Sequence, residues 1–117
     1  MIKVYAYSGC DGCKKALRWL KENDIAHTVL PIRETPPSTA ELNAMLEFQD
    51  NQLKKLFNVS GQDYRKMGLK DTLPSLSQEE AIDLLAQNGN LVKRPFLISE
   101  DLGLVGFKEE VWRSTLL

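Results

Sequence analysis

Short apolar runs and amphipathic stretches alternate along the chain, and their order predicts a mixed α/β fold. Residues 3–7 (Lys-Val-Tyr-Ala-Tyr) have the aromatic and β-branched content of a strand. Apolar residues then recur at helical spacing from Lys14 to Asn23, which predicts an amphipathic helix. Residues 26–32, again rich in β-branched side chains, predict a second strand, and a βαβ unit normally pairs its strands in parallel. Pro31 predicts that this second strand lies at an edge of the sheet or ends there.

The middle of the chain carries only helix signals. Pro36-Pro37 mark a boundary, and two later segments have the spacing of a capping box, namely Ser38 with Glu41 and Ser77 with Glu80. They predict helices that end near Gln49 and near Asn88-Gly89, with two short helices between them over 52–58 and 62–67. We therefore expect a helical insertion over about residues 38–89.

The last third of the chain returns to strand signals. Residues 96–98 and 104–107 are short apolar runs, and residues 99–103 between them suit the turn of a β-hairpin. Residues 108–116 predict a closing helix with Val111, Trp112 and Leu116 facing inward. The order is βαβ, helical block, ββα, which is that of a thioredoxin-like core with an inserted helical block. We expect one such domain over residues 1–117.

The motif with the clearest chemistry is Cys10-Asp11-Gly12-Cys13, placed where the first strand should turn into the first helix. The unpaired N–H groups and the dipole at a helix N-terminus favour a thiolate, which is the form of cysteine that attacks. Cys10, the first and more exposed thiol, is the candidate nucleophile, and Cys13 is the candidate resolving thiol. Other residues expected to line a substrate site here are Ser8, Gly9, Gly12 and Lys14, together with Arg94 and Pro95 from a later segment. Lys14 and Lys15 either favour the thiolate through their charge or form a solvated face.

Since these are the only two cysteines, few alternatives remain. A structural zinc site takes about four ligands, and the chain adds only one histidine, His27, so such a site would have to be shared between two chains. A secreted, disulfide-stapled domain would carry more cysteines and longer disulfide loops. Two incidental thiols are the remaining alternative to a redox pair. We expect no metal and no bound organic cofactor.

Composition fits one compact domain with an ordinary core: 117 residues, of which 43% are hydrophobic and 26% charged, with a net charge of -1. There is no basic stripe, so we expect no direct binding of nucleic acid. No apolar run approaches the ~20 residues that span a bilayer. The first residues enter a strand without a secretory segment, so we expect a cytoplasmic protein, in which a CxxC is more often catalytic or redox-sensing than structural.

A second informative segment, Lys93-Arg94-Pro95-Phe96, precedes the third predicted strand. Proline cannot donate to a sheet ladder, so it suits the first position of a strand. In thioredoxin-like folds a cis proline at this position faces the CxxC. We therefore predict a cis Arg94–Pro95 bond, although only ~5–6% of X–Pro bonds are cis, and an Arg94 side chain that projects toward Cys10. There it would lower the thiol pKa and bind an oxyanion or carboxylate; an ordinary surface arginine is the alternative.

Several segments, in order, resemble the arsenate reductase (ArsC)/Spx family along essentially the whole chain. They are Cys10-x-x-Cys13, Pro36-Pro37-Ser38, Tyr64-x-x-Met67-Gly68-Leu69, Arg94-Pro95 and Val105-Gly106-Phe107. The resemblance implies a thioredoxin-like fold with an inserted helical subdomain. Members include glutathione/glutaredoxin-dependent arsenate reductases, Spx redox-sensing regulators that bind RNA polymerase, and YffB-like proteins of unknown substrate.

The resemblance implies roles for some residues, and at other positions this sequence departs from the family. Cys10 matches the family's catalytic position, and Arg94 matches an arginine that contacts the oxyanion in the arsenate reductases. Two further arsenic-binding arginines of those enzymes are replaced here by Asn58 and Gly106, and those enzymes lack a second cysteine where Cys13 stands. The loss of these guanidinium partners removes most of the charge-assisted binding of arsenate, so the sequence favours the Spx/YffB-like side. Compensation by Lys54, Lys55, Arg65 or Lys93 is the alternative.

Three functions are therefore expected, in this order. The first is a thiol–disulfide oxidoreductase that uses Cys10 and takes electrons from glutathione, glutaredoxin or thioredoxin, with glutathione as a co-substrate and not a bound cofactor. The second is an Spx-type redox-sensing regulator that binds the α-subunit of RNA polymerase. The third is a glutathione-dependent arsenate reductase, against which Asn58 and Gly106 argue.

Overall fold

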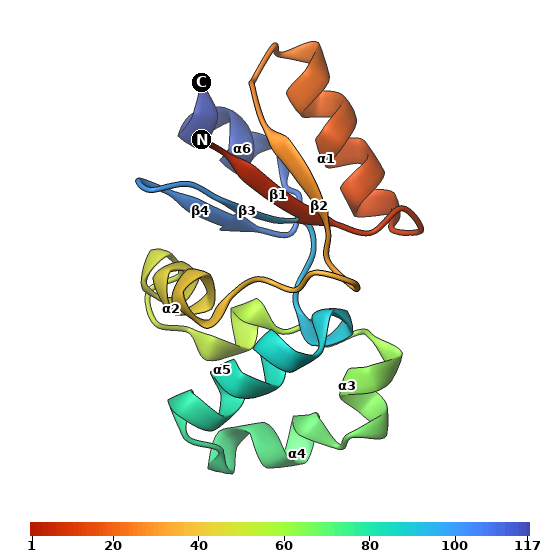
Figure 1. Cartoon of the computed structure of the whole chain (residues 1–117), viewed down its shortest axis with the longest axis vertical. Coiled ribbons are helices and arrows are strands. Elements are labelled where there is room, and N and C mark those ends of the chain that lie inside the picture. Colours follow the sequence, from red (N-terminus) through yellow and green to blue (C-terminus); the bar gives the residue numbers. More distant parts are fainter.

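The computed structural model describes residues 1–117 and contains a four-stranded mixed sheet in the order β2-β1-β3-β4 (Figure 1). The strands are β1 (Lys3–Ala6), β2 (Thr28–Pro31), β3 (Phe96–Ile98) and β4 (Gly103–Val105). β1 pairs in parallel with β2 and antiparallel with β3, and β3 and β4 form an antiparallel hairpin. The expected α/β, thioredoxin-like fold is confirmed, and Pro31 lies on an edge strand, where its missing N–H costs no ladder bond.

Helices fill the rest of the chain. The α-helices are α1 (Asp11–Glu22), α2 (Thr39–Phe48), α3 (Gln62–Lys66), α4 (Leu69–Thr72), α5 (Gln78–Gln87) and α6 (Glu109–Leu116). The 3-10 helices are η1 (Leu53–Leu56), η2 (Leu73–Ser75) and η3 (Gly89–Leu91). The block from α2 to η3 separates β2 from β3 in the sequence, and it lies below the sheet in Figure 1, while α1 and α6 lie above it. None of these helices has both the length and the apolar character that crossing a bilayer requires.

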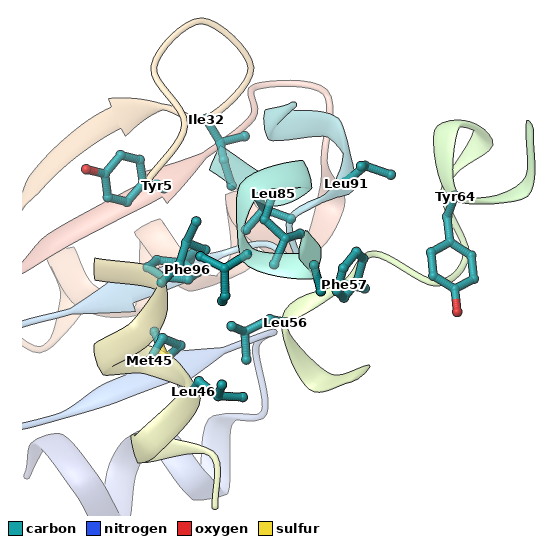
Figure 2. Close-up of a cluster of buried hydrophobic side chains, with 14 of the residues drawn as sticks. Tyr5, Ile32, Met45, Leu46, Leu56, Phe57, Tyr64, Leu85, Leu91 and Phe96 are labelled. Atoms are coloured by element: carbon teal, nitrogen blue, oxygen red, sulfur yellow. The ribbon is translucent and has the colours of Figure 1, made fainter. Parts of the chain in front are cut away.

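The two faces of the sheet belong to two separate cores, because successive side chains of a strand point to opposite faces. Tyr5, Phe96 and Ile98 belong to a cluster of 17 buried residues shared with the helical block. Figure 2 shows this cluster, in which side chains of α2 and α5 gather around Phe96. Val4 and Leu97 belong to a second cluster, of 9 buried residues, shared with α1 and α6. The helix that carries the CxxC and the helical block therefore cover opposite faces of the sheet.

Both predicted capping boxes are present. In the first, Ser38 Oγ accepts from the Glu41 N–H at 3.1 Å and Glu41 Oε1 accepts from the Ser38 N–H at 3.0 Å. Glu41 also accepts from the Tyr5 hydroxyl at 2.7 Å and from Lys3 Nζ at 3.1 Å, which ties α2 to β1. Burial works to raise the pKa of Glu41, but these hydrogen bonds outweigh it and hold the pKa below its ordinary value. The second box, at the start of α5, is formed by Ser77 and Glu80 alone.

The structure differs from the sequence prediction mainly at the ends of elements. α1 begins at Asp11, ahead of the predicted Lys14, because the Cys10 side chain caps it. Residues 53–56 form a 3-10 helix, and α4, η2 and η3 were not predicted. The prediction that Val111 faces inward is wrong, since it is 45% exposed, whereas Trp112 is 1% exposed. Trp112 and the half-buried Leu116 pack toward the core on the α1 face of the sheet, as predicted, and Val111 lies on the other side of α6.

Candidate thiol redox site

Cys10 is the N-cap residue of α1. Its backbone is extended, with φ -100° and ψ 119°, and its Sγ accepts from the Cys13 N–H at 3.4 Å. The Cys10 carbonyl accepts from the Lys14 N–H at 3.1 Å, which begins the helical ladder. An N-cap side chain is usually the oxygen of Ser, Thr, Asp or Asn, so a sulfur here meets unpaired backbone donors and the positive end of the helix dipole. This environment stabilises a thiolate at Cys10.

Several groups set the acidity of Cys10. Burial of the half-buried thiol works to raise its pKa, but the Cys13 thiol and N–H and the Arg94 guanidinium outweigh it, so the pKa lies below its ordinary value. Lys14 and Lys15 are exposed and are not among the groups that lower it. Arg94, rather than the lysines of α1, supplies the positive charge that acts on the thiol.

Cys13 differs sharply from Cys10. It is 1% exposed and belongs to the core cluster on the α1 face of the sheet. Burial, together with the interaction with Cys10, raises the pKa of Cys13 to about 12, against a smaller lowering effect of the Tyr7 backbone and Arg94. The pair therefore combines a half-buried cysteine whose pKa is lowered with a buried cysteine that stays protonated near neutral pH.

Arg94 and Pro95 lie immediately before β3. The predicted cis Arg94–Pro95 bond is confirmed. Pro95 is buried, and the half-buried Arg94 places its guanidinium carbon 5.0 Å from the centre of the Tyr7 ring. The same guanidinium is near enough to Cys10 to lower the pKa of the thiol, so Arg94 is not an ordinary surface arginine.

Arg33, which the sequence analysis did not single out, also contacts this site. Its guanidinium carbon lies 4.7 Å from the centre of the Tyr7 ring, so one ring carries two arginines. Tyr7 also lies over the turn before Cys10, since a Cβ at Gly9 would be only 2.6 Å from Tyr7 Cε2. The available signal was topological: β1 and β2 are parallel, so residues that follow the two strands meet at one edge.

The other predicted site residues surround Cys10 with different exposure. Ser8, Gly9 and Lys14 are exposed, and Gly12 is half-buried with its Cβ position 3.9 Å from Cys10 Sγ. The Nδ1 atom of His27 is paired with the Ile25 carbonyl at 2.7 Å. No group of three or more His, Cys, Asp or Glu side chains lies close enough together to hold a metal ion.

The two positions that the resemblance matches to further arginines of the arsenate reductases, Asn58 and Gly106, carry no arginine here. Gly106 has φ 71°, a conformation that favours glycine, and a Cβ there would lie 3.1 Å from Lys93 Cε. Asn58 packs against the following turn, with its Nδ2 2.7 Å from the Cβ position of Gly61. The end of the Lys93 side chain occupies the space next to Gly106, with Nζ 4.0 Å from the Cβ position of this glycine.

The mixed sheet, the CxxC at the start of α1 and the proline directly before β3 together define a protein of thioredoxin-like fold. The family model described as the ArsC family matches residues 5–115, and the chain belongs to that family.

Relatives of known sequence include an uncharacterized protein and a transcriptional regulator. The uncharacterized protein YusI of Bacillus subtilis is 42% identical over 109 residues, covering 93% of this chain and 92% of YusI. The global transcriptional regulator Spx of Listeria innocua is 28% identical over 116 residues, covering 99% of this chain and 87% of Spx.

Solved structures match over nearly the whole chain. An ArsC family related protein from Bacteroides fragilis superposes with a TM-score of 0.91 at 42% identity, covering 97% of this chain and 95% of that one. A structure described as a possible arsenate reductase from Streptococcus mutans gives a TM-score of 0.88 at 37% identity, with 97% and 98% covered.

Proposed function

We propose that this protein is a thiol–disulfide oxidoreductase in which Cys10 is the nucleophile and Cys13 the resolving thiol. The observation that carries the proposal is the contrast between the two cysteines: the pKa of Cys10 is lowered at the start of α1, while burial raises the pKa of Cys13 to about 12. The contrast has a structural cause, since Cys10 caps α1 beside Arg94 whereas Cys13 is 1% exposed in the core on the α1 face of the sheet. The arrangement supports an ordered attack, first by Cys10 and then by Cys13.

The reaction has two exchange steps. The Cys10 thiolate attacks one sulfur of a substrate disulfide, a mixed disulfide forms, and the substrate S–S bond breaks to release one thiolate. Cys13 then gives up its proton, which the released thiolate can accept, and attacks Cys10 Sγ. The Cys10–Cys13 disulfide forms and the second substrate thiolate leaves, so two electrons pass to the substrate. Glutathione, glutaredoxin or thioredoxin is the proposed donor that reduces the protein again.

Arg94 has two proposed roles in this cycle. Its charge favours the Cys10 thiolate before attack, and its planar fork suits a carboxylate or oxyanion of the substrate. Arg33 offers a second guanidinium on the same Tyr7 ring. The pair supports a substrate that carries negative charge close to its reacting sulfur.

The test is NADPH-coupled reduction of a small disulfide such as hydroxyethyl disulfide, with glutathione, glutathione reductase and glutaredoxin, or thioredoxin and its reductase, as donor systems. Turnover that Cys10→Ser abolishes supports the proposal. In the Cys13→Ser variant, Cys10 should still attack the substrate disulfide. Without the resolving thiol, the mixed disulfide between Cys10 and the substrate should accumulate and be visible by intact mass. Wild type and Cys10→Ser proteins that are equally inactive with every donor would rule the proposal out.

A second candidate function is redox-dependent regulation of the Spx type, favoured by the similarity to Spx along 99% of the chain. Its test is retention by the C-terminal domain of the RNA polymerase α-subunit, compared between reduced and oxidised protein. Binding that changes with the redox state supports this function, and absence of binding in both states removes it. Arsenate reduction is disfavoured by Asn58 and Gly106, and arsenate-driven, Cys10-dependent oxidation of NADPH would overturn that judgement.

A further inference from the structure

A cleft of about 580 Å³ lies between the helical block and the β4–α6 end of the sheet, and it does not include Cys10 or Arg94. It is half apolar. Its cationic members come from three segments: Lys54 and Lys55 from η1, Lys93 from the segment before β3, and Lys108 from the start of α6. We call it the lysine cleft.

The lysine cleft is a local excess of positive charge on a chain whose net charge is -1. Four lysines line it, and no Asp or Glu is among its 14 lining residues. None of the four is in an ion pair, since the two salt bridges of the structure are Lys3–Glu41 and Arg113–Glu109. Unpaired cations around one hollow select for a negatively charged partner through charge complementarity.

The apolar part of the lysine cleft is also without a partner. Val59 and Val111, at 40% and 45% exposed, are among the most exposed large apolar residues of the chain, and both line the cleft. Val111, which was predicted to face the core, lines the cleft instead. An occupant that covered these side chains would bury apolar surface in addition to pairing charge.

The polar groups that line the cleft suit a docked peptide segment better than a small ligand. The Gln49 amide already donates to the Gly103 carbonyl at 3.1 Å, and Trp112 Nε1 donates to the Gly106 carbonyl at 3.0 Å. The cations are lysine amines on flexible stems, which give charge without a fixed direction. Small-molecule sites depend on fixed, convergent polar groups, so this lining suits carboxylates on a peptide segment better.

The lysine cleft is joined to the redox site through the backbone. Lys93 directly precedes Arg94, and the Gly106 N–H donates to the Pro95 carbonyl at 2.9 Å. Phe107, which lines the cleft, packs on Trp19 of α1 with ring centres 6.3 Å apart. One wall of the cleft therefore continues into the segment whose arginine acts on Cys10.

We propose that the lysine cleft docks an acidic segment of the protein whose disulfide Cys10 attacks, with carboxylates on the lysines and an apolar side chain against Val59 and Val111. This rests on the proposed thiol–disulfide exchange and adds the class of its substrate, a disulfide flanked by acidic and apolar residues. The chemistry is unchanged: the substrate disulfide gains two electrons and the Cys10–Cys13 pair loses them.

The exchange test uses two short peptides, each with one cysteine in a mixed disulfide with thionitrobenzoate. One carries three Asp or Glu residues and a leucine, and its matched partner carries Asn or Gln in their place. Electrostatic guidance accelerates association by 10-fold or more at low ionic strength, so the wild-type protein should react about tenfold faster with the acidic peptide. High salt should remove the difference.

Lys54→Gln/Lys55→Gln and Lys93→Gln should each lower the ratio of the acidic-peptide rate to the neutral-peptide rate. The matched control is Lys66→Gln/Lys70→Gln, which removes two exposed lysines of α3 and α4 outside the cleft and should keep the preference. Circular dichroism melts of all variants establish that they are folded.

A binding arm separates this proposal from the proposed function. The acidic peptide with serine in place of cysteine is titrated into ¹⁵N-labelled protein, and amide shifts at Val59, Gly106 and Phe107 are followed. If the serine peptide binds at the cleft but neither thionitrobenzoate peptide is exchanged, the result contradicts the oxidoreductase and leaves the cleft as a docking site. Equal exchange rates for both peptides, with no shifts at the cleft, would overturn the docking proposal alone. Succinate that binds the cleft as tightly as the peptide would overturn it in favour of a small anion.

Discussion

The substitution Gly9→Ala should displace the Tyr7 ring, over which the Arg94 guanidinium lies, and it changes neither cysteine. A Cβ at Gly9 would meet the Tyr7 ring at 2.6 Å from Cε2 and 3.0 Å from Cζ, and the ring carries the Arg94 guanidinium. The ring must therefore move about 0.8 Å to bring the shortest contact from 2.6 Å to an ordinary 3.4 Å. Since the atoms in conflict belong to the far end of a side chain, the ring can yield while the backbone stays in place.

The size of the effect follows from the contact that is lost. A cation–π contact at a partly exposed site is worth about 0.5–1 kcal/mol, which corresponds to a factor of two to five in the population of the aligned arginine. We expect Gly9→Ala to slow alkylation of Cys10 by iodoacetamide two- to fivefold at pH values below the pKa of the thiol. The rate at high pH, where the thiol is fully ionised, should not change. Negatively charged iodoacetate should be slowed more, because the arginine also attracts the reagent.

Gly12→Ala is the matched control for Gly9→Ala. Its Cβ would lie 3.9 Å from Cys10 Sγ, an ordinary contact, and the position is the second residue of α1, where alanine fits the helical backbone at least as well as glycine. This variant should be at least as stable as the wild type and should keep the alkylation rate. If Gly9→Ala alkylates like the wild type at every pH, Tyr7 does not position Arg94 and the reasoning fails.

Three further predictions concern the thiols and the core. Because burial raises the pKa of Cys13 to about 12, iodoacetamide at pH 8 should modify only Cys10 in the folded, reduced protein, and intact mass should show a single adduct until denaturant is added. Glu41→Gln should cost about 1–2 kcal/mol by urea unfolding at pH 7, since it weakens the hydrogen bonds from two β1 side chains, and should cost more than Glu80→Gln in the exposed capping box. The pKa of Glu41 is lowered from 4.5 in the folded state, so this cost should be complete above pH 4.5 and disappear as the pH falls through the lowered pKa; a constant cost would contradict the network. Trp112→Ala should lower the free energy of unfolding by about 3–5 kcal/mol, because Trp112 is 1% exposed, and a loss below 1 kcal/mol would mean that α6 is not part of the core.

Features set by local sequence could be predicted. The two capping boxes depend on a serine and a glutamate three residues apart, and both have the expected hydrogen bonds. The edge position of β2 followed from the missing N–H of Pro31. The cis bond before β3 was expected from the thioredoxin-like order of elements and the position of Pro95.

Features set by contacts between distant segments could not be predicted. Arg33 follows β2 and Arg94 precedes β3, and only the folded sheet brings both to the Tyr7 ring. The inward-facing side of α6 was only partly predicted, because the apolar pattern does not distinguish Val111 from Trp112. Val111 is 45% exposed and lines the lysine cleft, whereas Trp112 is 1% exposed. The difference in acidity between the thiols needed the burial of Cys13, which the motif alone does not give.

The most direct test of the account is a redox titration of the Cys10–Cys13 pair across glutathione buffers, read by alkylation and intact mass. The account predicts a reversible disulfide between these two cysteines, with a potential in the ~-180 to -270 mV range of thiol-exchange proteins. A pair that never closes, with Cys10 alone becoming glutathionylated, would contradict the two-thiol mechanism and favour a cycle that uses one cysteine.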